Sequence, residues 1–425
     1  MTHPPVYNES MNSDANRMVG ALSGQPMERP DAERVISVGH DQRQFCLYPA
    51  QSGYDLQDEM DFLSRRAMEP NIFFAARFLA PAMPRLDDRQ IRMAIIRDDG
   101  PSRSRLRLLM PFSVEKPGFS VGPSIVRVWA NTFGPLGTPL VDAEGAAETI
   151  DNLLEGMGRK EAGLPGVLVF PELRLNGPFA QMLRAIAIGR NLPIVITDNQ
   201  KRPMLESYLD GDAYLQQTVS ASHLREMRRQ WKKLSEMGEL TYNVARQPEE
   251  IRLRMEEFLA LEASGWKGKK RTAMVMDRLH SAFAREAITN LAETDAVRIH
   301  TIDLDGRAIA SLIVFIMAGE AYTWKTAYDE TLSAYSPGKL LTARLTEWQL
   351  EDANILRTDS CAVADHPIMS RMWQEREDMG TVTVGLSPNS DRDARQAASQ
   401  LHLYRNTRNM ARLLREKIFA MTGRS

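Results

Sequence analysis

Residues 297–341 read VRIHTIDLDGRAIASLIVFIMAGEAYTWKTAYDETLSAYSPGKLL. Two runs of β-forming residues, 297–304 and 307–317, flank Asp305-Gly306, a dipeptide that favours a type I′ hairpin turn. In a third run, residues 322–329, Tyr322, Trp324 and Thr326 alternate with Thr323 and Lys325, which is typical of a strand with one buried face. The segment therefore predicts three consecutive antiparallel strands.

A helix is predicted to begin directly after these strands, near Gly338. Ser336-Pro337-Gly338 precedes Leu341, Leu345 and Trp348, which are at helical spacing. The first N–H groups of a helix lack intrahelical partners, and the helix dipole favours negative charge there. Pro337 presets φ, Gly338 lets a ligand approach the main chain, and Lys339 adds a cation. The segment indicates a site for a phosphate-bearing cofactor, although such a triplet also serves simply to cap helices.

This order of motifs resembles the acetyltransferase domain of the proteins called cellulose-biosynthesis type. They belong to the GNAT superfamily and are related to the Fem-type peptidyl transferases. The resemblance is strongest over residues 220–375 and includes FLALEASGWKG at residues 258–268. It implies an acyltransferase that uses acetyl-CoA as co-substrate and no metal. The usual GNAT loop is richer in glycine and commonly begins with Gln or Arg. By resemblance the coenzyme A diphosphate falls on Tyr335, Ser336, Pro337, Gly338, Lys339 and Leu340.

GNAT chemistry is direct attack of an acceptor on a thioester, so the enzyme must orient and deprotonate the acceptor and stabilise an oxyanion. Backbone N–H groups of residues 311–315 are predicted to supply the oxyanion contact where sheet pairing splays, with Ser311 and Val314 as cofactor contacts. Asp329 follows the third strand and is the first candidate for the base; the alternative is that it caps the turn into Glu330-Thr331.

Two further residues are candidates for proton transfer. Tyr328 is placed to protonate the departing thiolate, and His366 to accept a proton near neutral pH. Both residue types are also common in structural roles at such positions. Cys361 has no flanking motif and is interpreted as a small buried hydrophobic residue rather than a nucleophile.

The acceptor cleft is predicted, by resemblance, beside the GWKG loop at residues 265–268. Lys325 is predicted to contact an acidic group rather than act as a base, because its charge would first have to be lost. The acceptor is an amine or hydroxyl of a small molecule or saccharide, and the resemblance suggests a cell-envelope precursor. The candidate acceptor-binding residues are Trp266, Lys267, Trp324, Lys325 and Asp365.

Two alternative functions stay open at this point. One is Fem-type aminoacyl transfer from charged tRNA, for which the basic helix predicted at residues 221–237 would be the relevant feature. The other is a non-catalytic accessory protein of polysaccharide biosynthesis that keeps the fold for binding. Affinity for coenzyme A would count against the second alternative.

The N-terminal half repeats the order of the C-terminal half. Its WAN at residues 129–131 and GPLGTPL at 134–140 also resemble the family. We therefore predict an α/β (α+β) fold of two tandem GNAT-like domains, each a mixed twisted sheet flanked by helices. The repeated elements are strands at 91–97, 106–115 and 125–130, a helix at 143–157 and a strand at 167–170. The predicted divisions are a disordered segment 1–34, a structural copy 35–215 and an acyltransferase domain 216–425.

Composition sets the remaining limits. The 425 residues are 43% hydrophobic and 25% charged with a formal net charge of −2, which disfavours nucleic acid or an anionic membrane as a global partner. Apolar stretches stay well short of the roughly 18 residues that indicate a membrane-spanning helix. Cys46 and Cys361 form no metal-ligand pattern or disulfide framework, so we expect a protein of the reducing cytoplasm.

Overall fold

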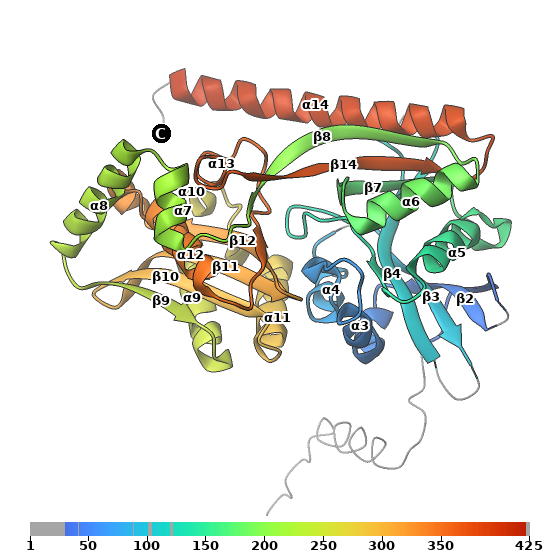
Figure 1. Cartoon of the computed structure of the whole chain (residues 1–425), viewed down its shortest axis with the longest axis horizontal. Helices are drawn as coiled ribbons and strands as arrows, with labels where there is room; N and C mark the ends of the chain where they lie inside the picture. The colour runs from blue at the N-terminus through green and yellow to red at the C-terminus, as the bar shows by residue number, and fades with distance from the viewer. Residues whose placement is uncertain (1–29, 41, 88, 101–103, 120–121, 422–425) are drawn as a thin grey trace, which may run out of the picture. The chain divides into compact units, whose positions relative to one another are not determined.

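A mixed sheet of 14 strands runs through the residues that the computed structural model describes, which are 30–421 apart from 41, 88, 101–103 and 120–121. Helices flank the sheet (Figure 1), so the predicted α/β (α+β) class is confirmed. Of the predicted disordered segment 1–34, residues 1–29 lie outside the described residues. The strand order is β1-β2-β3-β4-β5-β7-β14-β8-β13-β12-β11-β10-β9, with β6 paired to β4.

The C-terminal half contains the three predicted strands as an antiparallel meander. Asp305 and Gly306 both have positive φ, 50° and 75°, as a type I′ turn requires. The elements of this half are β9 (Leu240–Ala245), α9 (Pro248–Ser264), α10 (Trp266–Lys269), η3 (Met274–Met276), α11 (Arg278–Ala292), β10 (Val297–Leu304), β11 (Arg307–Met317), β12 (Glu320–Tyr328), η4 (Glu330–Tyr335), α12 (Pro337–Glu351), β13 (Arg357–Asp359) and α13 (Met369–Met372).

Two apolar cores form on the opposite faces of these strands. Ile313 and Phe315 of β11 lie in the core that α9 and α11 cover, whereas Leu312 and Val314 lie in the core that α12 covers. This alternation is the period of two expected of a strand that is buried on both faces. It fixes α12 on one side of the sheet, with its first turn beside the end of β12.

The N-terminal half has the same order of elements. In both halves a strand that follows the helix pairs in parallel with the third strand of the meander: β7 with β5, and β13 with β12. The elements are β1 (Arg34–Ser37), β2 (Arg43–Pro49), α2 (Ser52–Asp55), α3 (Gln57–Ser64), η1 (Ile72–Phe74), α4 (Ala76–Ala82), β3 (Arg92–Asp99), β4 (Ser104–Glu115), β5 (Ile125–Val128), β6 (Leu140–Val141), α5 (Ala146–Gly158), η2 (Lys160–Ala162) and β7 (Val167–Arg174).

The two halves are joined through long strands that the sequence analysis did not predict. β14 (Glu375–Gly385) pairs with both β7 and β8 (Ile194–Leu205), and β8 also pairs with β13. Figure 1 shows β8 and β14 running beside each other, with α14 packed along them. The remaining helices are α6 (Pro178–Gly189), α7 (Gly211–Thr218), α8 (Ala221–Ser235) and α14 (Asp391–Met421). The predicted division at residues 215 and 216 falls within α7 and remains a prediction.

Buried charges tie the halves together where β7, β8, β12 and β13 meet. The Asp359 carboxylate is fully buried and accepts hydrogen bonds from Arg174 Nη2 at 3.3 Å and Arg202 Nη1 at 3.2 Å. Arg174 also binds the buried Glu320 at the start of β12, its Nη1 lying 3.0 Å from Glu320 Oε2. The guanidiniums come from the N-terminal half and the carboxylates from the C-terminal half. This cluster therefore cross-links the two meanders.

None of the helices in the described part of the chain is both long and apolar enough to cross a membrane, α14 included.

Candidate cofactor site

A cavity of about 550 Å³ lies at the N-terminus of α12. It is bounded by the start of α12, the end of β12, the α7–α8 junction and the segment around α13. Four of the predicted cofactor residues, Ser336 to Lys339, line it together with Tyr328. The other lining residues are Thr218, Val219, Ser220, His223, Ser333, Pro367, Ile368, Arg371 and Met372.

The first turn of α12 has an unusual backbone. Its N-cap, Ser336, is left-handed at φ 52° and ψ 51°, a conformation that is strained for a residue other than glycine. The Ser336 carbonyl accepts from the N–H groups of Lys339 at 3.0 Å and Leu340 at 3.2 Å. A Cβ on Gly338 would meet Tyr328 Cδ1 at 3.5 Å, an ordinary contact. The cavity therefore reaches the main chain of the helix start at Gly338.

Cations gather around this helix start. Lys339 and Arg371 both line the cavity, and the pKa of Lys339 is lowered by burial and by the charge of Arg371, against the opposing charge of Glu226. The His223 ring is fixed, with Nδ1 2.9 Å from Ser220 Oγ. An anion placed between Lys339 and Arg371 would relieve their repulsion and would also meet the positive end of the α12 dipole.

Four of the predicted cofactor residues do not line this cavity. Tyr335 and Leu340 flank the lining residues in sequence, but Leu340 is buried in the core beneath α12. Ser311 and Val314 are fully buried on β11, which is paired with β10 on one side and β12 on the other. The prediction that pairing splays along residues 311–315 is wrong, because both edges of β11 are occupied there.

The sheet opens between β12 and β13 instead. Their pairing covers only Glu320 to Tyr322, opposite Arg357 to Asp359. From Thr323 onward, the β13-facing edge of β12 has no pairing with β13. A register shift between Ile313 and Val314 on β11 makes Trp324 a bulge on β12. The part of β12 that is not paired with β13 runs from Thr323 to Tyr328, and Tyr328 lines the cavity.

The three predicted catalytic residues are placed differently. Tyr328 lines the cavity. Asp329 caps η4, since its Oδ1 accepts from the Thr331 N–H at 2.9 Å and the Thr331 hydroxyl at 2.6 Å. His366 Nδ1 accepts from the Met369 N–H at 3.2 Å, and burial lowers the pKa of His366 against the opposing charge of Asp365. The capping alternative for Asp329 is thus present in the structure.

On the acceptor side, the structure places part of the N-terminal half against the bulge. Lys325 Nζ donates to the Thr132 carbonyl at 2.9 Å and lies 4.4 Å from the centre of the Phe133 ring. Trp324 Nε1 donates to the Phe133 carbonyl at 2.7 Å. The sequence analysis missed Thr132 and Phe133, and only their place in a family-like Gly/Pro loop could have pointed to them.

The GWKG loop is held close to the same region. Lys267 Nζ binds Glu262 Oε1 at 2.7 Å, and the charge of Lys267 acts on Lys325. The Trp266 N–H donates to the Glu330 carboxylate, while the Trp266 ring is 48% exposed. Lys267, Trp324 and Lys325 are therefore brought together, whereas Asp365 is exposed and precedes Pro367 of the cavity wall by two residues.

Burial changes the charge of Lys325. Removal from water and, to a smaller extent, the charge of Lys267 lower its pKa from 10.5 to about 8, against the opposing charge of Glu262. The rings of Phe133 and Trp324, at 4.4 and 5.7 Å, favour the ammonium form. Near pH 8 the side chain is thus present in both forms, so the loss of charge that was the argument against Lys325 as a base takes place near neutral pH.

This pKa predicts a pH-dependent stability. Because the pKa in the folded state lies below that of the unfolded chain, the unfolded chain holds more protons between about pH 8 and 10.5, and stability rises with pH in that window. Relative to Lys325→Met, the parent should gain up to about 3 kcal/mol from pH 7 to pH 10. Urea unfolding of both proteins across this range measures the gain, and parallel profiles would show that the Lys325 pKa is normal.

Among the residues that the structure describes, no group of three or more His, Cys, Asp or Glu side chains could hold a metal ion. Cys361 is half-buried against the core, and burial raises its pKa well above the usual value, which disfavours a thiolate nucleophile.

The comparisons with known proteins bear on the segment that contains this helix start. Residues 221–361 match the family model described as the acetyltransferase (GNAT) domain. The GNAT match runs from α8 to just beyond β13 and contains the α12 start, the bulge at Trp324 and the GWKG loop. No curated protein matches the chain by sequence.

Several solved structures are similar at low sequence identity. The C-terminal domain of a putative lysylphosphatidylglycerol synthetase from Agrobacterium fabrum is 10% identical, with a TM-score of 0.48 over 82% of this chain and 95% of that one. FemX is 8% identical, with a TM-score of 0.49 over 77% and 95%. A tandem GNAT protein from the clavulanic acid biosynthesis pathway is 14% identical, with a TM-score of 0.38 over 81% and 99%.

Proposed function

We propose that the protein is an acyltransferase that binds acetyl-CoA at the N-terminus of α12 and transfers the acyl group to an amine or hydroxyl acceptor. The observation that carries this proposal is the 550 Å³ cavity at the α12 start, inside the segment that matches the GNAT domain. Ser336 to Lys339 line it, with Arg371 as a second cation.

The cavity walls suit the two chemical parts of coenzyme A. A diphosphate would be met by the helix dipole, by Lys339 and by Arg371, with Gly338 leaving room at the main chain. Val219, Ile368 and Met372 offer an apolar wall to the uncharged parts of the ligand. From Tyr328 the opening beside β12 continues toward Trp324, and an extended pantetheine arm can follow it as an added strand would.

In this arrangement the thioester would react beside β12, at its cavity end if Asp329 is the base and at the bulge if Lys325 is the base. The β13-facing edge of β12 is not paired with β13 from Thr323 onward, and main-chain N–H groups on this edge would stabilise the oxyanion. The acceptor would enter past Trp266, Trp324 and the Phe133 loop. The proton from the acceptor would go to Asp329 or, as a competing candidate, to the neutral form of Lys325. Tyr328 would protonate the thiolate, and His366 remains a further candidate for proton transfer.

For the acceptor we favour a saccharide or another cell-envelope precursor. The support is the family resemblance and the aromatic rings of Trp266 and Trp324, since such rings pack well against apolar sugar faces. Transfer from charged tRNA is less well supported, because part of the charge on α8 is compensated. Arg229 pairs with Glu226 at 2.7 Å, and Lys232 lies 4.0 Å from Glu236.

Calorimetric titration with acetyl-CoA tests the cofactor site. Gly338→Asp places a carboxylate where the diphosphate would lie, so Kd should rise at least about tenfold, equivalent to about 1.4 kcal/mol. Gly338→Ala is the matched control, since its Cβ meets Tyr328 at an ordinary 3.5 Å, and it should bind almost as the parent does. No binding by the parent, or equal binding by the aspartate variant, would sink the proposal.

A further inference from the structure

The hydrogen-bond register makes Asp142 and Asp329 equivalent positions in the two halves. Val141 pairs with Leu108 as Tyr328 pairs with Ala310. In each half the N–H of the following aspartate donates to a carbonyl on the neighbouring strand, one residue before the paired residue. The Asp142 N–H donates to the Arg107 carbonyl at 2.8 Å, and the Asp329 N–H to the Ile309 carbonyl at 2.8 Å. The two halves are thus in matching register at the end of the third strand.

The same equivalence extends into the helix that follows. Each aspartate accepts, at Oδ1, the N–H two residues ahead: Glu144 at 3.0 Å for Asp142, and Thr331 at 2.9 Å for Asp329. Each helix then begins after a left-handed N-cap, Gly145 at φ 70° for α5 and Ser336 at φ 52° for α12. The N-terminal half therefore contains a copy of the α12 helix start.

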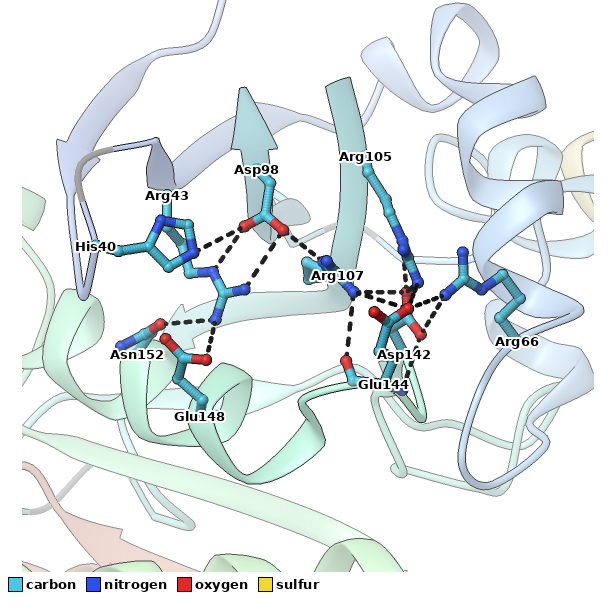
Figure 2. Close-up of polar contacts among 10 residues, drawn as sticks. All are labelled: His40, Arg43, Arg66, Asp98, Arg105, Arg107, Asp142, Glu144, Glu148 and Asn152. Atoms are coloured by element: carbon cyan, nitrogen blue, oxygen red, sulfur yellow. Dashed lines mark hydrogen bonds and ion pairs between the residues drawn. The ribbon is translucent and has the colours of Figure 1, made fainter. Parts of the chain in front are cut away.

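At this N-terminal helix start, carboxylates and guanidiniums of the chain pair with one another, as Figure 2 shows. The Asp142 side chain is only 2% exposed and binds three guanidiniums, with Arg105 Nη2 at 2.7 Å, Arg66 Nη2 at 3.1 Å and Arg107 Nη1 at 3.4 Å. Glu144, next to the N-cap, binds Arg105 Nη2 at 2.7 Å and Arg66 Nη2 at 2.9 Å. We call these five residues the Asp142 clamp.

Within the described residues, the C-terminal half lacks arginine partners like those of the Asp142 clamp at its own aspartate, Asp329. By register, Ile309 replaces Arg107 and the exposed Arg307 replaces Arg105. In the part of the chain that the structure describes, the partner of Asp329 is Thr331, and no arginine bonds to its carboxylate. Six residues of η4 also separate Asp329 from its helix, and Ser333 of η4 lines the cavity. The cations there face the cavity instead of an internal carboxylate.

A second difference lies in the strand that precedes the aspartate. Val128 pairs with Phe112 as Thr323 pairs with Val314, and Leu140 pairs with Leu109 as Ala327 pairs with Ser311. Residues 129–139 therefore stand where the C-terminal half has only the bulge of residues 324–326. This longer segment carries Thr132 and Phe133, whose carbonyls accept from Lys325 and Trp324.

We propose that each chain binds one acyl-CoA, at α12, and that the N-terminal half is a closed copy of this site whose residues 129–139 instead form the acceptor-side wall of the C-terminal half. This proposal rests on the proposed function. In the Asp142 clamp, the two carboxylates neutralise the arginines that could otherwise bind a diphosphate at the start of α5. Residues 129–139, which would border a second opening, contact the C-terminal half instead. The duplicated fold thus has one reactive site.

The test is the stoichiometry of acetyl-CoA binding by the full chain, with a matched pair of variants at the two helix starts. The parent should bind one equivalent, Gly338→Asp should lose it, and Gly145→Asp should keep it with Kd within about twofold of the parent. Aspartate is among the residues that tolerate the left-handed conformation of Gly145. Two equivalents, or one that survives in Gly338→Asp and vanishes in Gly145→Asp, would overturn the closed copy while leaving acyl-CoA binding intact.

A second measurement does not depend on coenzyme A. Asp142→Asn uncouples three arginines from a buried carboxylate and should lower Tm by about 4 °C or more, whereas Asp329→Asn, at the equivalent turn without arginine partners, should lower it by less than about 2 °C. Equal melting of the two variants would show that the clamp does not hold the N-terminal copy closed. If no protein binds acetyl-CoA but this difference in Tm is found, the proposed function and the one-site proposal fall while the clamp stands.

Discussion

Asp359→Asn is expected to lower the free energy of unfolding by about 3 kcal/mol, because it removes the one buried carboxylate that Arg174 and Arg202 share and leaves Arg174 with Glu320 and Arg202 with Glu172. Arg174 and Arg202 are each only 3% exposed at the side chain and reach Asp359 from two different strands of the N-terminal half. Asp359 Oδ1 also accepts the Cys361 N–H at 2.7 Å, which fixes the turn after β13. The loss should therefore loosen the contact between the halves as well as the opening beside β12.

Urea unfolding measures this loss, with Asp365→Asn as the control because Asp365 is exposed. Burial acts to raise the pKa of Asp359, but Arg202 and Arg174 outweigh it and hold the pKa below the usual 3.8. A depressed pKa contributes stability that is complete above the unfolded value and is lost as pH falls through the folded value. The difference between parent and variant should be largest near neutral pH and shrink in acid. Equal stability of Asp359→Asn and Asp365→Asn would contradict the cross-linking role.

Asp329→Asn is expected to slow acyl transfer about 100-fold or more while leaving the Kd for acetyl-CoA within about twofold. The physical reason is that asparagine keeps the hydrogen bonds from Thr331 that cap η4 but cannot take a proton from the acceptor. Release of the coenzyme A thiol, followed with a panel of amine and saccharide acceptors, gives the rate. Titration of the same variant with acetyl-CoA checks that binding is unchanged.

The comparison with Lys325→Met distinguishes the two candidate bases. Asp329 lies at the cavity end of β12, whereas Lys325 lies at the bulge, about 13 Å away along an extended strand. If Asp329→Asn turns over like the parent and Lys325→Met does not, the neutral lysine is the base and the rate should rise through about pH 8, the pKa of Lys325. If only Asp329→Asn is slow, the carboxylate is the base and Lys325 serves the acceptor.

Much of the fold follows from local sequence. The Asp305-Gly306 turn and the flanking β-rich runs predicted β10 and β11 to the residue, and the Ser-Pro-Gly triplet predicted where α12 begins. The repeat of this order in the N-terminal half was also visible, since each part depends on neighbouring residues. By contrast, β14 pairs with strands almost 200 residues earlier in the chain, and such pairing leaves no local pattern.

The candidate site was predictable to the same extent. The residues of the α12 start appeared in one short motif, and the structure places most of them on one cavity. The opening beside β12 was assigned to the wrong edge, because it depends on how short β13 is rather than on the residues of β11. The lowered pKa of Lys325 depends on its burial against Phe133 and Thr132 from the other half, which the sequence does not reveal; the sequence analysis predicted instead that Lys325 contacts an acidic group.

The position of β14 also constrains how the chain is made. Strands β7 and β8 flank β14 in the finished sheet, yet β14 is synthesised about 170 residues after β8 ends. During that interval on the ribosome, both strands present unpaired edges that invite pairing with other chains. The N-terminal half can therefore complete its sheet only when the C-terminal half has emerged, so the two copies are expected to fold as one cooperative unit rather than in succession.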